Sequence, residues 1–485
     1  MLKRSKSQSY IISRFLTPAF VMLLPLLALG GSVSTSALAS PPMPNVSQGA
    51  QKPSDTAQTL VMRVYFRDNA QRDQLANELD AAEVSTVGGF LTVWGDHATY
   101  SRLVGRGIRT EIDEVQTIQA NVPVTFGNNP TTRPTSPDTF FGGYRTVEEN
   151  NAYMDQLVAA YPTLAEKVDI GDSWCKTHPG QCTQPDAWNG YDMLVLHITN
   201  RNIPGPKPVY WFEAGIHSRE IATPEMATRF MSQLLDGYAT DPDSRWLVDW
   251  HDIWIMPHVN PDGHHMVENA ASTPRTQRKN ADKDDGCAAY PPNDSSQMGT
   301  DLNRNFSFLW GCCGGSSGSP CSLTYRGPGA GSEEETQAVM NKIRALIPDQ
   351  RGPNNGDAAP IDATGIYQSM HSNASLNLYP WGWTTSASPN NADLKNIGMH
   401  MKALNAYPSG NNYQTCQPPV CLYAVDGDSS DWGYGELGIP SYTTEVAGSS
   451  FYPSYNCLDS GPPTCTDGDP TILNGIWPSN KGALI

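Results

Sequence analysis

Apolar and polar positions alternate along this chain in two patterns, and these predict two folded regions. In the first region, residues 57–120, the run LVMRVYF alternates as a half-buried strand does. The pattern predicts, in order, a strand in LVMRVYF, a helix over Asn69–Ala82, a strand over Thr86–Trp94, a short helix over Thr99–Val104 and a strand over Gly107–Ile112. We therefore expect a small α+β module in this region.

The second region, residues 144–485, alternates apolar strands with amphipathic helices. Strands are predicted over Asp192–Ile198, Pro208–Glu213, Asp252–Met256, Gly365–Met370 and Ser441–Val446, and helices over Val147–Tyr161, Pro224–Leu235, Ser332–Leu346 and Asn391–Asn405. Such alternation favours an α/β domain with a mostly parallel sheet. Two segments rich in proline and polar residues, 40–56 and 121–143, are predicted to be exposed linkers.

The amino terminus has the pattern of a secretory signal peptide over residues 1–39. Basic residues precede the apolar run FLTPAFVMLLPLLALG, and Ala37-Leu38-Ala39 offers a small-x-small cleavage site. The alternative, a membrane anchor, is disfavoured because Pro18 and Pro25 interrupt a run that is shorter than the ~20 apolar residues a span needs. We expect a secreted protein that has no membrane association after the signal peptide is removed.

Net charge and cysteine content indicate which partners and which cellular compartment to expect. The chain has 32 Lys and Arg against 49 Asp and Glu, a formal charge of -17, so a nucleic acid is not an expected partner. Its 10 cysteines include the near pairs Cys175 and Cys182, Cys416 and Cys421, and Cys457 and Cys465. In an exported protein these pairs predict short-range disulfides. A structural zinc cluster is the weaker alternative, because no CxxC pair occurs.

Metal-ligating side chains follow two of the predicted strands. His217 and Glu220, in HSRE, come just after an apolar run, and His371 comes directly after GIYQSM. A His-x-x-Glu spacing is frequent by chance, but ligands bind at the carboxyl ends of strands in α/β sheets. A catalytic zinc takes three protein ligands, and His371 is the best third candidate. His264 and His265 follow NPDG, which predicts a surface loop rather than a metal site.

Glu445, on the predicted strand in PSYTTEVAG, is a candidate for proton transfer. A lone glutamate at the end of an apolar strand is costly to bury unless it has a task or an ion-pair partner. An ion-paired structural glutamate is the alternative, so the residue is informative only together with the metal ligands.

Several motifs together resemble the zinc metallocarboxypeptidases of the carboxypeptidase A/B family, and most closely the bacterial carboxypeptidase T-like branch. They are HSRE, NPDG, QRKN, DLNRNF, HSNASLNLYPWGW and the segment from Tyr423 to Glu445, within about 135–485. The resemblance implies a mixed, largely parallel sheet with helices on both faces. The module before it resembles, more loosely, the propeptide-like region of bacterial members. The chain stops at NKGALI, where family members begin a last helix, so a truncated carboxyl end is expected.

The resemblance also implies a role for each matching residue. His217, Glu220 and His371 match the ligands of one Zn²⁺, and Asp301 matches the carboxylate that orients the first histidine. Glu445 matches the catalytic glutamate, and Arg278 matches the arginine that polarises the scissile carbonyl. Asn303 and Arg304 match the pair that grips the substrate's terminal carboxylate, Tyr423 matches the tyrosine that closes over it, and Arg219 matches a subsite residue. This set predicts an exopeptidase, because only a chain end supplies the carboxylate.

The same alignment places the specificity pocket in the segment from Asp426 to Trp432. Members that require Lys or Arg carry an aspartate at the place of Ser430, so a strictly basic preference is not expected. Leu378 and Gly382 would leave an apolar, roomy wall, and Asp428 would pair with a long basic side chain unless it faces solvent. We expect large apolar residues to be preferred and basic ones to be accepted.

These observations predict a monomeric zinc carboxypeptidase that acts on peptide or protein C-termini and is activated by another protease. Two alternatives remain at this point. A zinc amidase or endopeptidase acting on cell-wall peptides would lack the carboxylate grip, whereas Asn303, Arg304 and Tyr423 are present. A non-catalytic binding module would lack a zinc ligand or Glu445, and neither is missing.

Overall fold

The structure is a computed structural model that describes most of the chain after residue 58. The described residues are 59–122, 124, 126–127, 143–270, 276–293, 296–405, 413–448, 450–465, 467, 472 and 474–485. The predicted signal peptide, the 40–56 linker and most of the 121–143 linker lie outside these residues. Among the described helices, none is both long and apolar enough to cross a membrane.

The amino-terminal module is a four-stranded antiparallel sheet with helices, in the strand order β2-β3-β1-β4. Its elements are β1 Leu60–Tyr65, α1 Asn69–Glu78, β2 Asp80–Ser85, β3 Phe90–Gly95, α2 His97–Gly105, β4 Thr110–Ile112 and α3 Glu114–Ala120. The predicted end of the first helix, at Ala82, is wrong, because α1 ends at Glu78. Residues 80–85 form a strand, β2, that pairs with β3, so strand pairing overrides the helical pattern of this segment.

The larger domain is built on an eight-stranded mixed sheet in the order β11-β10-β12-β9-β7-β8-β6-β5. Its strands are β5 Ala165–Asp172, β6 Asp192–Ile198, β7 Val209–Ala214, β8 Asp252–Met256, β9 Ile366–Ser372, β10 Leu376–Leu378, β11 Gln414–Cys416 and β12 Ser441–Val446. The four central strands, β8, β7, β9 and β12, run parallel. The predicted mixed, largely parallel sheet is therefore confirmed.

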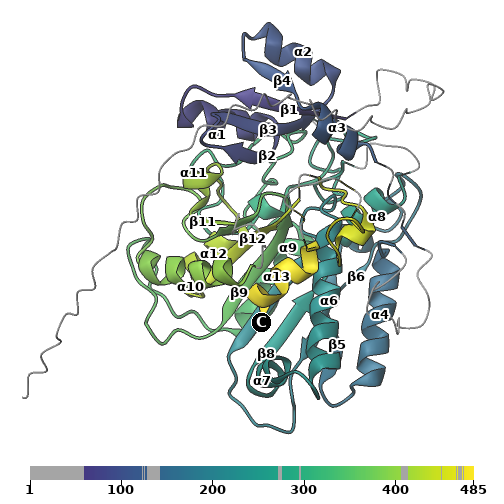
Figure 1. The fold of residues 1–485 in the computed structure, drawn as a ribbon, viewed down its shortest axis with the longest axis vertical. Helices are drawn as coiled ribbons and strands as arrows, with labels where there is room; N and C mark the ends of the chain where they lie inside the picture. Colours follow the sequence, from purple (N-terminus) through teal and green to yellow (C-terminus); the bar gives the residue numbers. More distant parts are fainter. Residues whose placement is uncertain are drawn as a thin grey trace, which may run out of the picture. The chain divides into compact units, whose positions relative to one another are not determined.

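Helices cover both faces of this sheet (Figure 1). In the described part of the domain they are α4 Val147–Ala160, α5 Trp174–Thr177, α6 Ala222–Gly237, α7 Pro242–Trp250, α8 Pro261–Glu268, α9 Glu334–Leu346, α10 Asn391–Leu404, α11 Pro418–Cys421, α12 Ser429–Leu437 and α13 Ile476–Leu484, with 3-10 turns η1 Leu302–Arg304 and η2 Tyr455–Cys457. Leu196 and Phe212 pack among α4, α6 and α13, whereas Val195 and Trp211 pack against α9 and α12. Strands buried on both faces need apolar residues at successive positions.

The NPDG segment begins helix α8, so the predicted surface loop is wrong. Asn260 caps this helix, with its side-chain oxygen accepting the N–H of Gly263 at 2.9 Å, and Pro261 takes the first helical position. Proline and an asparagine cap are helix-start signals as well as turn signals. His264 and His265 are consequently buried, at 1% and 8% exposure.

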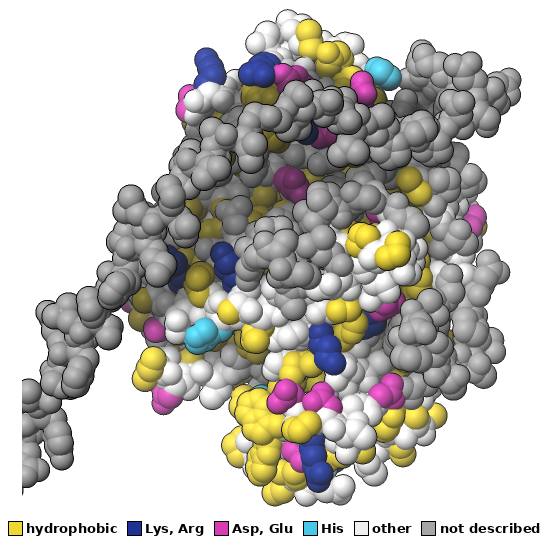
Figure 2. Space-filling model, in the orientation of Figure 1, with side chains coloured by type: hydrophobic (Ala, Val, Ile, Leu, Met, Phe, Trp, Pro, Cys, Tyr) yellow, Lys and Arg dark blue, Asp and Glu magenta, His cyan; other side chains and the backbone are white. Residues whose placement is uncertain are grey.

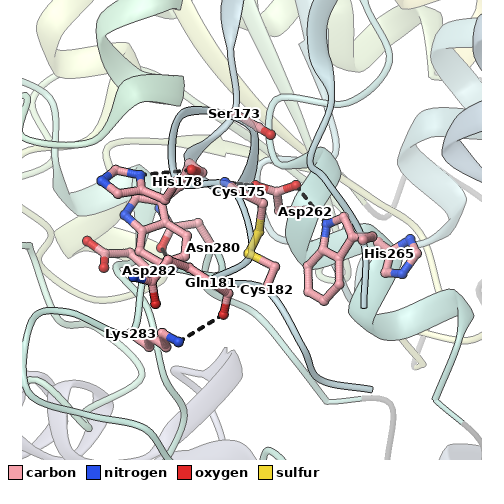
Figure 3. The surroundings of a disulfide bond; sticks show 12 residues. Ser173, Cys175, His178, Gln181, Cys182, Asp262, His265, Asn280, Asp282 and Lys283 are labelled. Atoms are coloured by element: carbon pink, nitrogen blue, oxygen red, sulfur yellow. Dashed lines mark hydrogen bonds between the residues drawn. A yellow bond between two sulfur atoms is a disulfide. The ribbon is translucent and has the colours of Figure 1, made fainter. Parts of the chain in front are cut away.

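Five disulfides close short or moderate loops, and no described cysteine is free. The three near pairs are bonded as predicted, and the remaining bonds join Cys287 to Cys321 and Cys312 to Cys313. Figure 3 shows the Cys175–Cys182 bond beside Asp262, whose carboxylate accepts the N–H of Cys175 at 2.8 Å. Among the described residues on the face drawn in Figure 2, Lys and Arg side chains are scattered among Asp and Glu rather than gathered in a patch.

Candidate active site

The candidate metal ligands and Glu445 lie at or just after the carboxyl ends of neighbouring parallel strands. His217 follows β7 after a turn at Gly215, whose φ of +64° is in the left-handed region. A Cβ on Gly215 would lie 2.9 Å from the carbonyl oxygen of Pro257, so the turn has room only for glycine. His371 lies near the end of β9, and Glu445 stands beside it in register on β12. This edge of the sheet is where α/β proteins bind ligands.

His217, Glu220 and His371, called the ligand triad below, converge on one point. The Nδ1 atom of His217 lies 2.7 Å from Glu220 Oε1 and 3.1 Å from His371 Nδ1. The other carboxylate oxygen of Glu220 lies 3.2 Å from His371 Nδ1. One candidate ligand atom from each residue lies within 4.8 Å of the other two, and all three residues are buried. Two imidazole nitrogens and one carboxylate fit a catalytic zinc ion with an open position.

Asp301 lies behind His217 and links it to Arg278. One oxygen of Asp301 is 3.2 Å from His217 Nε2, and the other accepts hydrogen bonds from Nε and Nη2 of Arg278 at 3.0 and 2.9 Å. Asp301 is fixed in turn, because it caps η1 and accepts the N–H of Asn303 at 3.0 Å. A carboxylate on the outer nitrogen of a histidine orients the ring and leaves the other nitrogen for a metal.

The carboxyl groups in and behind the pocket have pKa values shifted in opposite directions. Burial opposes the charge of Glu220, but His217 and His371 outweigh it and hold the pKa of Glu220 well below its usual value. Burial likewise opposes the charge of Asp301, and its positively charged neighbours hold that pKa well below the ordinary value. Glu445 differs, since burial raises its pKa to about 7. A carboxyl group with a pKa near neutrality is suited to taking and giving a proton.

Arg304 and Asn303 lie in the same pocket as the ligand triad. Arg304 is 2% exposed, with Nε donating to the carbonyl of Gly315 at 3.1 Å and Nη1 donating to the carbonyl of Asn303 at 2.7 Å. The side-chain nitrogen of Asn303 is 3.4 Å from His371 Nε2. The buried guanidinium and the ligand triad therefore line one pocket, with Asn303 between them in contact with both.

The amino-terminal module forms one wall of this pocket. Ala81 and Ala82 line it beside Tyr423, whose hydroxyl donates to the carbonyl of Ala81 at 3.1 Å. Helix α1 adds a further contact, since Nη2 of Arg72 donates to the carbonyl of Pro419 at 3.0 Å. The tyrosine that the resemblance assigns to the substrate carboxylate is thus bonded to the module.

Asp428 and Ser430 line the pocket together with Leu378. Asp428 caps α12, and its Oδ1 accepts the hydroxyl of Ser430 at 2.7 Å. Its Oδ2 is buried and has no hydrogen-bond partner in the described part of the chain, and burial raises the pKa of Asp428. With 3% exposure, Asp428 does not face solvent. Gly382 borders it, because a Cβ there would lie 3.1 Å from Oδ2.

Arg219 completes the set of predicted residues that line the pocket, and its guanidinium lies 4.3 Å from the centre of the Phe451 ring. Asp301 and Gly382 do not line the pocket: Asp301 lies behind His217, and Gly382 lies beside Asp428. The sequence reasoning missed Phe451, Val425 and Thr443, which also line it. Thr443 could have been found from the two-residue alternation that places it on the same side of β12 as Glu445, whereas Phe451 follows the strand in a segment with no pattern.

A ligand triad of two histidines and a glutamate at the carboxyl edge of an α/β sheet, beside a glutamate with a near-neutral pKa, defines the class of zinc-dependent hydrolases. Comparison with known families is more specific. The family model described as zinc carboxypeptidase matches residues 150–461, more than half of the chain. The chain therefore belongs to the zinc carboxypeptidase family, as the motifs indicated.

Individual relatives agree with this assignment. Carboxypeptidase A2 of Rattus norvegicus is 29% identical over 315 residues, which are 64% of this chain and 64% of that protein. Carboxypeptidase B of Astacus astacus is 30% identical over 311 residues, which are 64% of this chain and 88% of that protein. The chain thus spans less than two thirds of the length of the rat relative. Membership of the bacterial carboxypeptidase T-like branch stays a prediction.

The solved structure of a carboxypeptidase A from Helicoverpa armigera shares the fold. It aligns with a TM-score of 0.63 at 23% sequence identity and covers 88% of this chain and 97% of that chain. Residues 144–485 are 342 of the 485 residues, about 71%. The shared fold therefore extends into the amino-terminal module.

Proposed function

We propose that this chain is a zinc-dependent carboxypeptidase that releases C-terminal residues from peptides and proteins. The observation that carries the proposal is that a buried arginine, Arg304, lines the same pocket as the ligand triad. A planar guanidinium matches a carboxylate with two parallel hydrogen bonds. Only the end of a chain presents a carboxylate next to a scissile peptide bond, so the pocket favours an exopeptidase over an endopeptidase or amidase.

The chemistry follows from the places of the side chains. Zinc held by the ligand triad would polarise the scissile carbonyl and lower the pKa of a water molecule towards ~7. Glu445, with a pKa of about 7, takes the proton of the attacking water and delivers it to the leaving amine. Arg278, held by Asp301, stabilises the negative charge that develops on the carbonyl oxygen. Arg304 and Asn303 hold the terminal carboxylate while this happens.

Zinc dependence and exopeptidase activity are tested together. Dipeptides with an N-terminal block and a free C-terminus should be hydrolysed, and the same peptides amidated at the C-terminus should be hydrolysed far more slowly. A chelator should abolish the activity and added zinc should restore it. Faster cleavage of the amidated peptides would favour an amidase or endopeptidase, and full activity after exhaustive chelation would exclude a zinc enzyme.

The amino-terminal module is proposed to keep the enzyme inactive until it is removed. Two observations support this. Ala81 and Ala82 line the pocket, and the carbonyl of Ala81 accepts a hydrogen bond from the Tyr423 hydroxyl. Cleavage is expected within 121–143, where the only basic residue, Arg133, precedes a proline. A trypsin-like protease is therefore not the expected activator. N-terminal sequencing of active enzyme should start between residues 122 and 144, and a fully active form starting at residue 40 would refute inhibition by the module.

The pocket is proposed to prefer large apolar residues and to accept basic ones. Leu378 and Val425 supply apolar walls, whereas the unpartnered Oδ2 of Asp428 can accept a bond from a Lys or Arg side chain. A panel of blocked dipeptides varied at the last residue should rank Phe above Arg. Asp428→Asn should lower the Arg/Phe ratio. An unchanged ratio would exclude Asp428 from recognition, and much faster cleavage of Arg than of Phe would refute the order.

Secretion and a monomeric state complete the proposal. The signal-peptide pattern of residues 1–39 and the pairing of all ten cysteines support an exported protein. Mass analysis of protein collected outside the cell should show that residues 1–39 are missing, and light scattering should give the mass of one chain. Retention of residues 1–39 in the cell-associated fraction would contradict export.

A further inference from the structure

A loop of residues 312–316, called the brace loop here, contacts Arg304 and has no part in the mechanism described above. Nε of Arg304 donates to the carbonyl of Gly315 at 3.1 Å, and Nη1 donates to the carbonyl of Asn303 at 2.7 Å. Because a guanidinium is planar, two fixed acceptors on the protein side set the plane in which its other N–H groups lie. The position of Gly315 therefore controls the direction in which Arg304 can hold a carboxylate.

Asp426 fixes the brace loop. It is 1% exposed, and its Oδ2 accepts the N–H groups of Cys313 and Gly315 at 3.0 and 2.8 Å. Its Oδ1 accepts the hydroxyl of Ser316. Hydrogen bonds to a charged acceptor are about twice as strong as neutral ones, so three of them order a segment that lacks regular secondary structure. Asp426 thus acts on Arg304 through the loop rather than by direct contact.

The brace loop also contacts Val425, which lines the substrate pocket. A Cβ on Gly315 would lie 2.3 Å from the carbonyl carbon of Val425, so the two backbones are in direct contact. The residues that follow η1 contact the same segment, because the N–H of Phe306 donates to the carbonyl of Gly427 at 2.9 Å. The loop consequently couples Arg304 to the segment that carries Tyr423 and Asp428.

The Cys312–Cys313 disulfide closes the start of the brace loop. Since the two cysteines are neighbours in sequence, the ring they form contains the peptide bond whose N–H Asp426 accepts. Both cysteines are exposed, whereas each of the other four disulfides has at least one buried cysteine. Access governs the rate of thiol–disulfide exchange, so a reductant reaches this bond before the others.

We infer that Asp426 and the Cys312–Cys313 disulfide are positioning groups for Arg304, and that reduction of this disulfide weakens the grip on the substrate's terminal carboxylate. The inference rests on the proposed carboxypeptidase function. A dithiol can carry out this reduction. Its first thiolate attacks one cysteine sulfur to give a mixed disulfide, and its second thiolate attacks that mixed disulfide and releases the cysteine, so that two cysteine thiols and one new disulfide result. The opened ring releases the Cys313 N–H, and the Gly315 carbonyl moves with it.

The first experiment reduces the wild-type, zinc-loaded enzyme in its active form. A phosphine replaces the dithiol, because dithiols bind zinc; it becomes a phosphine oxide with oxygen from water while the disulfide becomes two thiols. Alkylation and peptide mapping identify the reduced pair, and metal analysis confirms that zinc is retained. For a peptide with a free C-terminus, KM should rise about tenfold while kcat changes less than about twofold. Reoxidation should restore KM.

Variants separate the two positioning groups. Asp426→Asn keeps the size of the side chain but removes the charge, and should raise KM by a similar factor without a reductant. Cys312→Ser combined with Cys313→Ser should raise KM and abolish the response to phosphine. Ser317→Ala is the matched control, since its hydroxyl bonds to the N–H of Ser319 at 3.1 Å rather than to Asp426. The inhibition constant of 3-phenylpropionate, a simple carboxylate, should shift in parallel with KM.

The outcomes distinguish the inference from the function on which it rests. If the untreated wild type releases no C-terminal residues, the proposed function and the inference both fall. If it is active but KM stays constant after reduction mapped to Cys312 and Cys313, the inference alone falls. A fall in kcat at constant KM also overturns it, because the loop would then act on the chemical step. Should the double serine variant not fold, reduction of the wild type and Asp426→Asn decide the question.

Discussion

Replacing Asp301 by asparagine tests how the candidate metal site is supported. Asp301 is fully buried, and its two oxygens contact different groups, His217 Nε2 and the guanidinium of Arg278. Asparagine has nearly the same shape, but it carries no charge and accepts hydrogen bonds through one atom only. Asp301→Asn therefore leaves either the ring N–H of His217 or the Arg278 cation without an acceptor.

Two separate effects are expected, with different magnitudes. Removing one partner of a buried ion pair costs about 3–5 kcal/mol of folding free energy. Arg278 and Asp301 are 6% and 0% exposed, so water does not screen their attraction. Losing the carboxylate partner of a ligating histidine lowers metal affinity about 10–100-fold, or about 1.4–2.8 kcal/mol.

The two effects are measured independently. Competition with a chromophoric chelator gives the zinc dissociation constant, and thermal unfolding of the metal-free protein gives the stability. Asp362→Asn, at an exposed position, is the control. Adding Arg278→Met to Asp301→Asn should recover part of the stability, because the unpaired cation is gone, but should not recover zinc affinity. A zinc dissociation constant equal to that of the wild type in Asp301→Asn would refute the support of His217 by Asp301.

Three further predictions concern single residues. Glu445→Gln should retain one zinc per chain and lose about 10²–10⁴ in kcat, and wild-type turnover would exclude Glu445 as the proton carrier. Arg304→Lys should lower kcat/KM for free C-termini about a hundredfold, because a point charge replaces a planar fork; equal kcat/KM would contradict the grip. Burial raises the pKa of Glu333 from 4.5 to about 7, so the folded protein holds this proton more tightly than the unfolded chain. The contribution of the Glu333 proton to stability is full below pH 4.5 and is lost as the pH rises to about 7. Glu333→Gln should therefore flatten the dependence of Tm on pH over this range. An unchanged curve would argue against a buried proton on Glu333.

Elements whose apolar pattern matched their final environment could be predicted from the sequence. The strands Asp192–Ile198, Asp252–Met256 and Ser441–Val446 have the predicted bounds. The first two contain apolar runs that pack on both faces of the sheet. Two predictions failed because the same sequence pattern is compatible with two kinds of local structure. Residues 80–82 continue a helical spacing yet pair as a strand, and NPDG is both a turn signal and the start of a helix.

The sequence by itself determined the candidate chemistry of this protein. The ligand triad and Glu445 are recognisable from residue types and their place on or after predicted strands, whereas Arg304 is recognisable from the resemblance of DLNRNF to the family motif. Only the tertiary structure decided which groups hold them in place. Asp426 contacts Gly315 across 111 positions, and Gly315 contacts Arg304 across 11. Ala81 meets Tyr423 across 342 positions. Local patterns report hydrogen bonding and burial over a few residues, whereas such contacts depend on how the packed sheet and its loops bring distant segments together.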